Sequence, residues 1–196
     1  MALGYLALSS ADGNEFENIG IGTYALFNLN GGYMNTAIGT SAGYFLTTGN
    51  NNTAVAPSAL NKVTTGTYNT AVGVRCLGQS LTTSSYNTGL GANAGRYVTG
   101  GNNVAIGYEA LSTNGNSASD NTAIGYQALE ENTTGTQNTA VGSLALDANT
   151  EGHYNASLGY NSLGSNTTGG QNVAVGYDAL QANTTAFYNT AVGKGS

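Results

Sequence analysis

The chain has 196 residues, of which 30 are glycine, 13 are tyrosine, 40% are hydrophobic and only 7% are charged. Globular domains carry about 25% charged residues, and disordered segments combine high net charge with few aromatics, so the composition favours a repetitive architecture. Four Lys and Arg against ten Asp and Glu give a net charge of -6, which excludes nucleic acid as a partner. No apolar stretch approaches the roughly 18 residues that span a bilayer, and we therefore expect no membrane insertion.

A pentapeptide of the form Asn-Thr-Ala-(Val/Ile)-Gly recurs along the whole chain, at intervals of 16 to 18 residues and most often 17. Its last position falls at Gly4, Gly22, Gly39, Ala56, Gly73, Gly91, Gly107, Gly125, Gly142, Gly159, Gly176 and Gly193. Residues 2–8 match residues 174–180, so the apolar start of the chain belongs to a repeat unit and not to a signal peptide. We predict a single repeat domain over residues 1–196, as a fragment of a longer fibre.

An asparagine stands four residues before the end of the pentapeptide in all eleven units where that position exists. Two explanations remain open: the side chains form a hydrogen-bonded ladder between stacked units, or each asparagine closes a turn in a left-handed conformation. The ladder prediction covers Asn18, Asn35, Asn52, Asn69, Asn87, Asn103, Asn121, Asn138, Asn155, Asn172 and Asn189.

The rest of each unit alternates short apolar patches with polar turns. The residue before the Gly is Val, Ile or Leu, which we predict to point inward, and the residue before that is small, as suits a short, closely approached strand. Ala and Leu, at three and four residues after the Gly, form a second patch, and turns such as residues 132–135 close the unit. These units are too short and too rich in glycine for helical hairpins. The sequence therefore predicts an all-β parallel β-solenoid of about twelve 17-residue coils.

A single coil buries too little apolar surface to offset the entropy of ordering about 17 residues. We therefore predict a homo-oligomer in which the small residues form a face against other copies, with a threefold axis.

Some units depart from the pattern. Ala56 and Pro57 replace the Gly and its follower, and proline is permitted there only at an edge or turn. Gly43 and Gly95 replace the Leu of the second patch, and we expect apolar residues slightly later in those units to supply the bulk. The only cysteine, Cys76, rules out an intrachain disulfide and should pack as a small apolar residue.

The segments 102–107 and 121–135 carry a resemblance to known families. The first resembles the coil motif of YadA-type trimeric autotransporter adhesin heads, and the second resembles repeats of bacteriophage tail fibres that often precede a self-cleaving chaperone domain. The resemblance implies a trimer of left-handed β-rolls, located extracellularly, on a cell surface or on a virion. The period is longer than that of the adhesin coil, and neither anchor, stalk nor chaperone domain is recognisable in this sequence.

Tyrosines are the candidate ligand-binding residues. Tyr108, Tyr126, Tyr160 and Tyr177 follow the repeated Gly and offer ring faces and hydroxyls to a host-surface glycan, although stacked tyrosines also pack along a solenoid without any ligand.

Parts of the sequence also fit three other functions. Glu130 and Asp147 fall one coil apart, at a spacing that resembles a retaining glycosidase pair and would suit a depolymerase spike. Repeated threonines could form an ice-binding array, although Ile19 and Ala156 are among the residues that interrupt it. Uncapped ends would permit a head-to-tail filament.

Catalytic signals are otherwise weak. His153 is the only histidine and is expected in a turn, and the acidic residues lack the spacing of calcium loops. We predict no enzymatic activity, no cofactor and no metal. The preferred function is a structural fibre or adhesin segment that extends a trimeric fibre and engages a host-surface glycan or protein.

Overall fold

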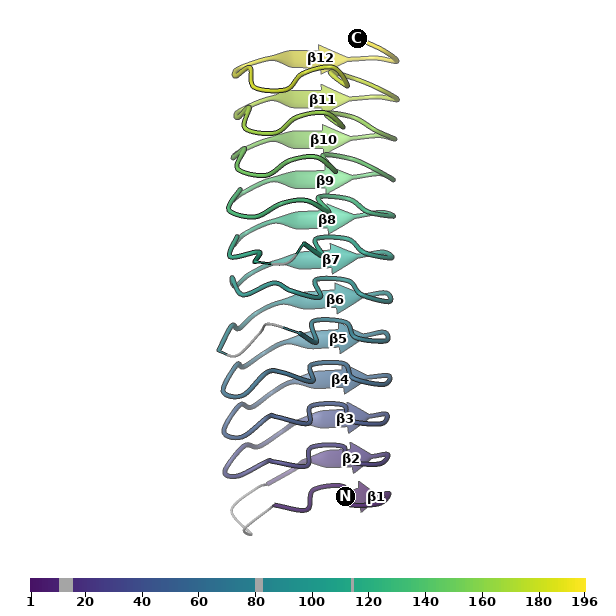
Figure 1. Cartoon of the computed structure of the whole chain (residues 1–196), viewed down its shortest axis with the longest axis vertical. Coiled ribbons are helices and arrows are strands. Elements are labelled where there is room, and N and C mark those ends of the chain that lie inside the picture. The colour runs from purple at the N-terminus through teal and green to yellow at the C-terminus, as the bar shows by residue number, and fades with distance from the viewer. Residues whose placement is uncertain (11–15, 80–82, 114) are drawn as a thin grey trace.

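The computed structural model describes residues 1–10, 16–79, 83–113 and 115–196. Within this part of the chain, every regular element is a short strand, and all strands pair in parallel, in sequence order, in one sheet (Figure 1). The prediction of an all-β parallel solenoid is confirmed. The strands are β1 (Ala2–Leu3), β2 (Ile19–Ile21), β3 (Thr36–Ile38), β4 (Thr53–Val55), β5 (Thr70–Val72), β6 (Thr88–Leu90), β7 (Val104–Ile106), β8 (Thr122–Ile124), β9 (Thr139–Val141), β10 (Ala156–Leu158), β11 (Val173–Val175) and β12 (Thr190–Val192).

The coils stack in register along one axis. In Figure 1 the strands run from left to right behind the loops while the chain climbs, so the solenoid is left-handed. Thr122 pairs with Thr139 at the regular spacing of 17, whereas Thr88 pairs with Thr70 and Val104 at spacings of 18 and 16. The strands keep their register in all three cases, because the loops take up the extra or missing residue.

The middle residue of each strand faces the interior. Ala123 and Ala140 are fully buried, whereas Ile124 and Val141, which follow them, are only half-buried and lie on the outer face of the sheet. The prediction that the branched residue before the Gly points inward is therefore wrong. The small residues fill the interior and do not form a face toward other copies.

The thickness of the coil explains this orientation. Each coil encloses a thin layer of side chains, in which the middle strand residue meets the opposite wall of the coil. A Cβ added to Gly89, the middle residue of β6, would overlap Sγ of Cys76 and lie 3.0 Å from Cγ of Leu77. A branched side chain does not fit in this space, so alanine, glycine or serine faces inward and the larger residues face outward.

The opposite wall carries the second apolar patch. Leu60, Leu111 and Leu129, each four residues after the pentapeptide, are fully buried, as predicted. Cys76 is also fully buried, in agreement with its expected role as a small apolar residue. A Cβ on Gly43 would lie 2.9 Å from Cδ2 of Leu26, and Leu46 three residues later is buried, so the irregular coil compensates as expected.

Single left-handed residues close each coil. They recur two and four residues after the Gly and directly before the asparagine, as at Gln127 (φ 52°), Leu129 (φ 53°) and Gln137 (φ 58°). The repeated glycines have positive φ angles, such as 143° at Gly125. Ala56 replaces this glycine in one unit and adopts a φ of 114°. Since residues with a Cβ rarely adopt such a φ, Ala56 is a strained point of the fold.

The predicted asparagine ladder is present, and we call it the strand ladder. The backbone N–H of Asn138 donates to Oδ1 of Asn121 (2.9 Å), and its Nδ2 donates to the carbonyl of Gly152 (2.8 Å). Oδ1 of Asn138 in turn accepts from the N–H of Asn155 (2.9 Å). The left-handed turn is made by the preceding residue, such as Gln137, so the alternative explanation of these asparagines is wrong.

A second asparagine ladder was not predicted. It lies seven residues after the Gly in the C-terminal coils, and we call it the corner ladder. Nδ2 of Asn149 donates to Oδ1 of Asn132 (2.9 Å), and Nδ2 of Asn166 donates to Oδ1 of Asn149 (2.9 Å). Asn183 continues the series above Asn166 (2.8 Å). In the sequence these residues look like ordinary turn asparagines, because the same position holds apolar residues in the N-terminal coils.

Candidate functional site: an uncovered sheet face and a charged edge

The outer face of the sheet is flat, and it carries polar and apolar side chains but no charged ones. It consists of the first and third residues of each strand, and we call it the sheet face. None of the residues of the twelve described strands is charged. The third residues form an aliphatic rank along the whole rod, in which Leu90 and Leu158 are 48% and 50% exposed. A continuous uncharged face of this kind is typical of an interaction surface.

A threonine rank accompanies the aliphatic rank on the same face. Thr36, Thr53 and Thr70 pair directly with one another in β3 to β5, and Thr122 pairs with Thr139 in β8 and β9. The rank is interrupted at the positions that the sequence indicated, which are Ile19, Val104, Ala156 and Val173. Hydroxyl and methyl groups therefore repeat at about 4.8 Å along the rod, with gaps.

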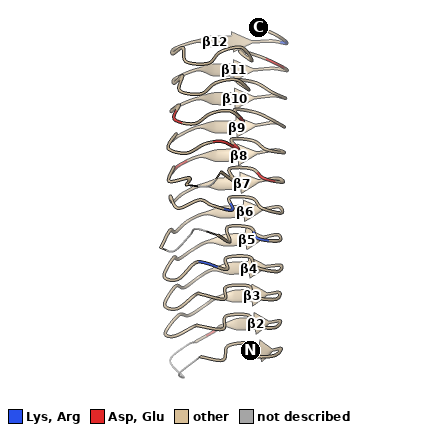
Figure 2. Ribbon diagram, viewed as in Figure 1, with Lys and Arg blue, Asp and Glu red and all other residues tan. Residues whose placement is uncertain are grey.

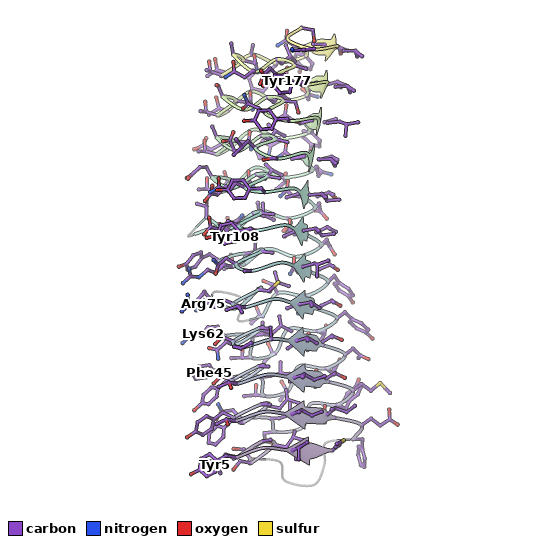
Figure 3. All side chains as sticks on the ribbon, turned by 90° about the vertical axis from the view of Figure 1, so that its right-hand side faces the viewer. Tyr5, Phe45, Lys62, Arg75, Tyr108 and Tyr177 are labelled. Atoms are coloured by element: carbon purple, nitrogen blue, oxygen red, sulfur yellow. The ribbon has the colours of Figure 1, made fainter. Side chains whose placement is uncertain are left out.

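The candidate tyrosines form two stacked pairs and not one continuous stripe. The rings of Tyr108 and Tyr126 have their centroids 5.8 Å apart, and those of Tyr160 and Tyr177 are 5.1 Å apart. Ser143 occupies the position between the pairs. All four rings are exposed, and Figure 3 shows Tyr108 and Tyr177 to the left of the strands. Binding of a host-surface glycan to them stays a prediction.

An aromatic cluster in the first coils was missed by the sequence reasoning. The ring of Tyr24 lies 5.8 Å from Tyr5 and 5.5 Å from Phe27, and Tyr44 stacks on Phe27 at 5.1 Å. Phe45 meets Tyr44 edge-on at 4.7 Å. An open groove of about 640 Å³ runs beside Phe45, and its lining consists of Ser10, Asn28, Asn30, Phe45, Thr47, Thr48 and Thr64. Phe27 and Tyr44 both stand five residues after the Gly, but Tyr5, Tyr24 and Phe45 stand at other positions of their units, which is why the repeat pattern did not reveal the cluster.

Glu130 and Asp147 lie on neighbouring coils, as predicted. Burial raises the pKa of Glu130, and the nearby carboxylates of Glu109, Glu131 and Asp147 raise it further. Burial also raises the pKa of Asp147, whose Oδ1 has no hydrogen-bond partner among the described residues. The pair therefore belongs to a larger group of like charges, and catalysis by it stays an untested alternative.

The remaining polar candidates have local explanations. Nδ1 of His153 lies 2.9 Å from the backbone N of Thr136, within a loop, as expected for a turn residue. Across the described ranges, no three His, Cys, Asp or Glu side chains are grouped so that they could hold a metal ion. None of the described residues forms a helix that could cross a membrane.

Charges are segregated along the rod. Lys62, Arg75 and Arg96 lie on the coils that follow β4, β5 and β6, whereas the acidic residues from Glu109 onward follow β7 and only Glu17 of the described acidic residues precedes the basic coils (Figure 2). Figure 3 shows Phe45, Lys62 and Arg75 one above another on the edge away from the sheet. Nζ of Lys62 lies 4.5 Å from the centre of the Phe45 ring, and the guanidinium of Arg96 lies 4.8 Å from that of Tyr97.

The coils after β4 to β9 thus present an edge that is basic in its lower part and acidic in its upper part. We call it the charged edge and define it by Lys62, Arg75, Arg96, Glu109, Glu130 and Asp147. No protein-family model matches this chain, and neither a curated protein nor a solved structure matches it.

Proposed function

We propose that this chain is a structural segment of a homo-oligomeric fibre, in which the sheet face is the contact between copies and three copies surround a common axis. The observation that carries the proposal is the aliphatic rank of the sheet face, which runs from β1 to β12 without a charged residue and is covered by no other element of the described residues. Burial of such a rank against other copies is favourable at about 25 cal/mol per Å².

The sheet face alone is smaller than the area that a stable contact buries. Twelve strands at about 4.8 Å make a face roughly 50 Å long, and its two ranks make it about 10 Å wide, or roughly 500 Å². Stable interfaces bury about 800 Å² on each partner. Around a threefold axis each copy contacts two others, so residues that flank the face are also buried.

The resemblance of the repeat to adhesin heads and tail-fibre repeats supports three copies and a location outside the cell or on a virion. In such a fibre the solenoid acts as a spacer, and host attachment falls to exposed groups such as Tyr108 and Tyr177. Head-to-tail filament growth is an alternative that uses the ends of the solenoid and not its face.

Charge placed on the sheet face tests the proposal. Leu90→Lys/Leu158→Lys puts two ammonium groups into the aliphatic rank, and Met34→Lys is the matched control, because Met34 is 50% exposed but lies outside the strands. Sedimentation equilibrium should find a trimer for the parent and the control, and monomers with unchanged circular dichroism for the double variant. A monomeric parent, or a double variant that remains trimeric, would refute the proposed contact.

The threonine rank favours one competing function, ice binding, which requires the same face to stay uncovered. Thermal hysteresis of the parent, lost in Thr53→Leu/Thr139→Leu, would support it. A parent that shows oligomers and no hysteresis would exclude this use of the face.

A further inference from the structure

Between residues 18 and 178 the order of charges divides the chain into two parts of opposite sign, with Asp12, Glu15 and Glu17 before this range and Lys194 after it. Residues 18–108 contain Lys62, Arg75 and Arg96 and no carboxylate, whereas residues 109–178 contain seven carboxylates and no Lys or Arg. Because consecutive coils stack along one axis, this order becomes a charge gradient along the rod (Figure 2).

The six residues of the charged edge share one segment of the coils. Each stands between two and six residues after the last position of its pentapeptide, in the segment that leads away from the sheet. Nε2 of Gln127 donates to Oε2 of Glu109 (3.3 Å), which joins the coils after β7 and β8 on this edge. The backbone N–H of Glu131 likewise donates to the carbonyl of Asp147 (2.9 Å). The basic and acidic groups therefore follow one another along the same segment of successive coils, Arg75 and Glu109 at its start and the other four groups three or four residues further on.

We propose that the charged edge is an antiparallel self-association surface, on which a second copy of this chain lies side by side with the first and runs in the opposite direction. The twofold axis passes between β6 and β7, so that the basic part of each copy faces the acidic part of the other. This surface is separate from the sheet face, and it joins fibres or chains laterally.

The coil order makes the two halves complementary. About this axis the coil after β4 of one copy faces the coil after β9 of the other copy. In the same way, the coil after β5 faces the coil after β8, and the coil after β6 faces the coil after β7. The facing residues are Lys62 with Asp147, Arg75 with Glu130, and Arg96 with Glu109. Both rods repeat at about 4.8 Å, so alignment of one pair aligns all three, and the reversed copy provides the same three contacts a second time.

The antiparallel direction follows from the charges. A parallel neighbour in register places like charges opposite each other, which is unfavourable. The twofold arrangement is isologous and closes with two copies, as most oligomeric contacts do. The same axis also brings the coil that carries Tyr44 and Phe45 opposite the coil that carries Tyr160, so aromatic surface meets aromatic surface beyond the charged pairs.

Charge-reversed variants test the proposal through mixing. The acidic-edge variant is Lys62→Glu/Arg75→Glu, and the basic-edge variant is Glu130→Lys/Asp147→Lys. Sedimentation velocity in about 0.01 M salt, where charges act over about 30 Å, should show lateral association of the parent. Each variant alone should associate about tenfold more weakly or worse, because facing edges carry like charges, and an equal mixture of the two should associate again.

The control keeps the charge change and moves it off the edge. Asp120→Lys/Glu151→Lys alters two exposed carboxylates that lie on the opposite corner of the coils, and it should associate like the parent. Association of the parent should disappear in about 1 M salt, whereas the sheet-face trimer should persist there. Variants that associate as strongly as the parent, or a mixture that does not associate, would overturn the proposal and leave the sheet-face contact untouched.

Disulfide trapping tests the direction. In a Cys76→Ala chain, Lys62→Cys/Asp147→Cys should form a covalent dimer on mild oxidation, because the two sites lie five coils apart in one chain, too far for an internal disulfide. Lys62→Cys/Glu109→Cys should not cross-link. Trapping of the second variant instead of the first would show a parallel, staggered contact and refute the twofold arrangement.

Discussion

The N-terminal and C-terminal coils form the same corner with side chains of opposite polarity. Seven residues after the pentapeptide, the N-terminal coils place apolar side chains such as Leu29, Leu46 and Val63 in the interior, and the C-terminal coils place the corner ladder there, as at Asn149. The backbone is alike in both: the N–H of Leu46 donates to the carbonyl of Gly43 (3.0 Å), and that of Asn149 donates to Leu146 (3.1 Å).

In the strand ladder an apolar residue cannot replace asparagine, and the hydrogen bonds explain this difference. At the corner the backbone N–H finds its acceptor within its own coil, so the side chain is free to be apolar or an amide. In the strand ladder the backbone N–H of each asparagine donates to Oδ1 of the asparagine one coil below, as Asn155 does to Asn138. Loss of that side chain leaves a buried N–H unpaired, which costs about 1 to 3 kcal/mol.

The strongest test of this difference compares two buried asparagines of neighbouring coils. Asn138→Leu should lower the free energy of unfolding by about 2 to 4 kcal/mol, because the N–H of Asn155 loses its acceptor. Asn149→Leu should cost only about 1 kcal/mol, since Asn166 keeps its bond to the carbonyl of Gly169 (2.9 Å). Urea unfolding at a fixed protein concentration measures both. Equal losses would show that the two ladders do not differ in the way proposed.

The N-terminal coils also contain a compensated irregularity that the C-terminal coils lack. Gly89→Ala should destabilise the fold by about 1 to 3 kcal/mol, because the new methyl group overlaps Sγ of Cys76. Cys76→Ala/Gly89→Ala restores the Ala–Ala pair of the regular coils and should recover most of the loss. If the double variant is no more stable than Gly89→Ala, steric conflict between these two positions is not the cause.

A smaller effect on stability is expected when the repeated glycine is restored at Ala56. Ala56→Gly removes a Cβ from a residue at φ 114° and should raise the free energy of unfolding by about 1 kcal/mol. Gly142→Ala makes the reverse change in a regular coil, at φ 141°, and should destabilise it. Thermal unfolding of the two variants gives the sign of each effect, and a less stable Ala56→Gly chain would contradict the strain at this position.

The smallest expected effect concerns the acidic coils. Burial raises the pKa of Asp147 in the folded chain above its usual value of about 3.9, so the folded state binds protons more tightly than the unfolded chain. Stability should therefore rise as the pH falls from neutral through the folded pKa, until both states are protonated. Asp147→Asn should raise the Tm slightly at about pH 7 and leave it unchanged below about pH 3. A lower Tm for the variant at neutral pH would contradict the unfavourable burial of this carboxylate.

The sequence by itself determined the architecture, because a period of 17 with an asparagine in every unit suffices to predict stacked coils, a parallel register and the ladder through Asn138 and Asn155. It did not determine which residue of the strand faces inward. An alternation of small and branched residues, such as Ala123 and Ile124, fits either orientation. Only the tertiary structure decided it, because the opposite wall of the coil leaves room for a methyl group and none for a branched side chain. The same closure placed Cys76 against Gly89, exposed the aliphatic rank, and brought distant charges onto one edge.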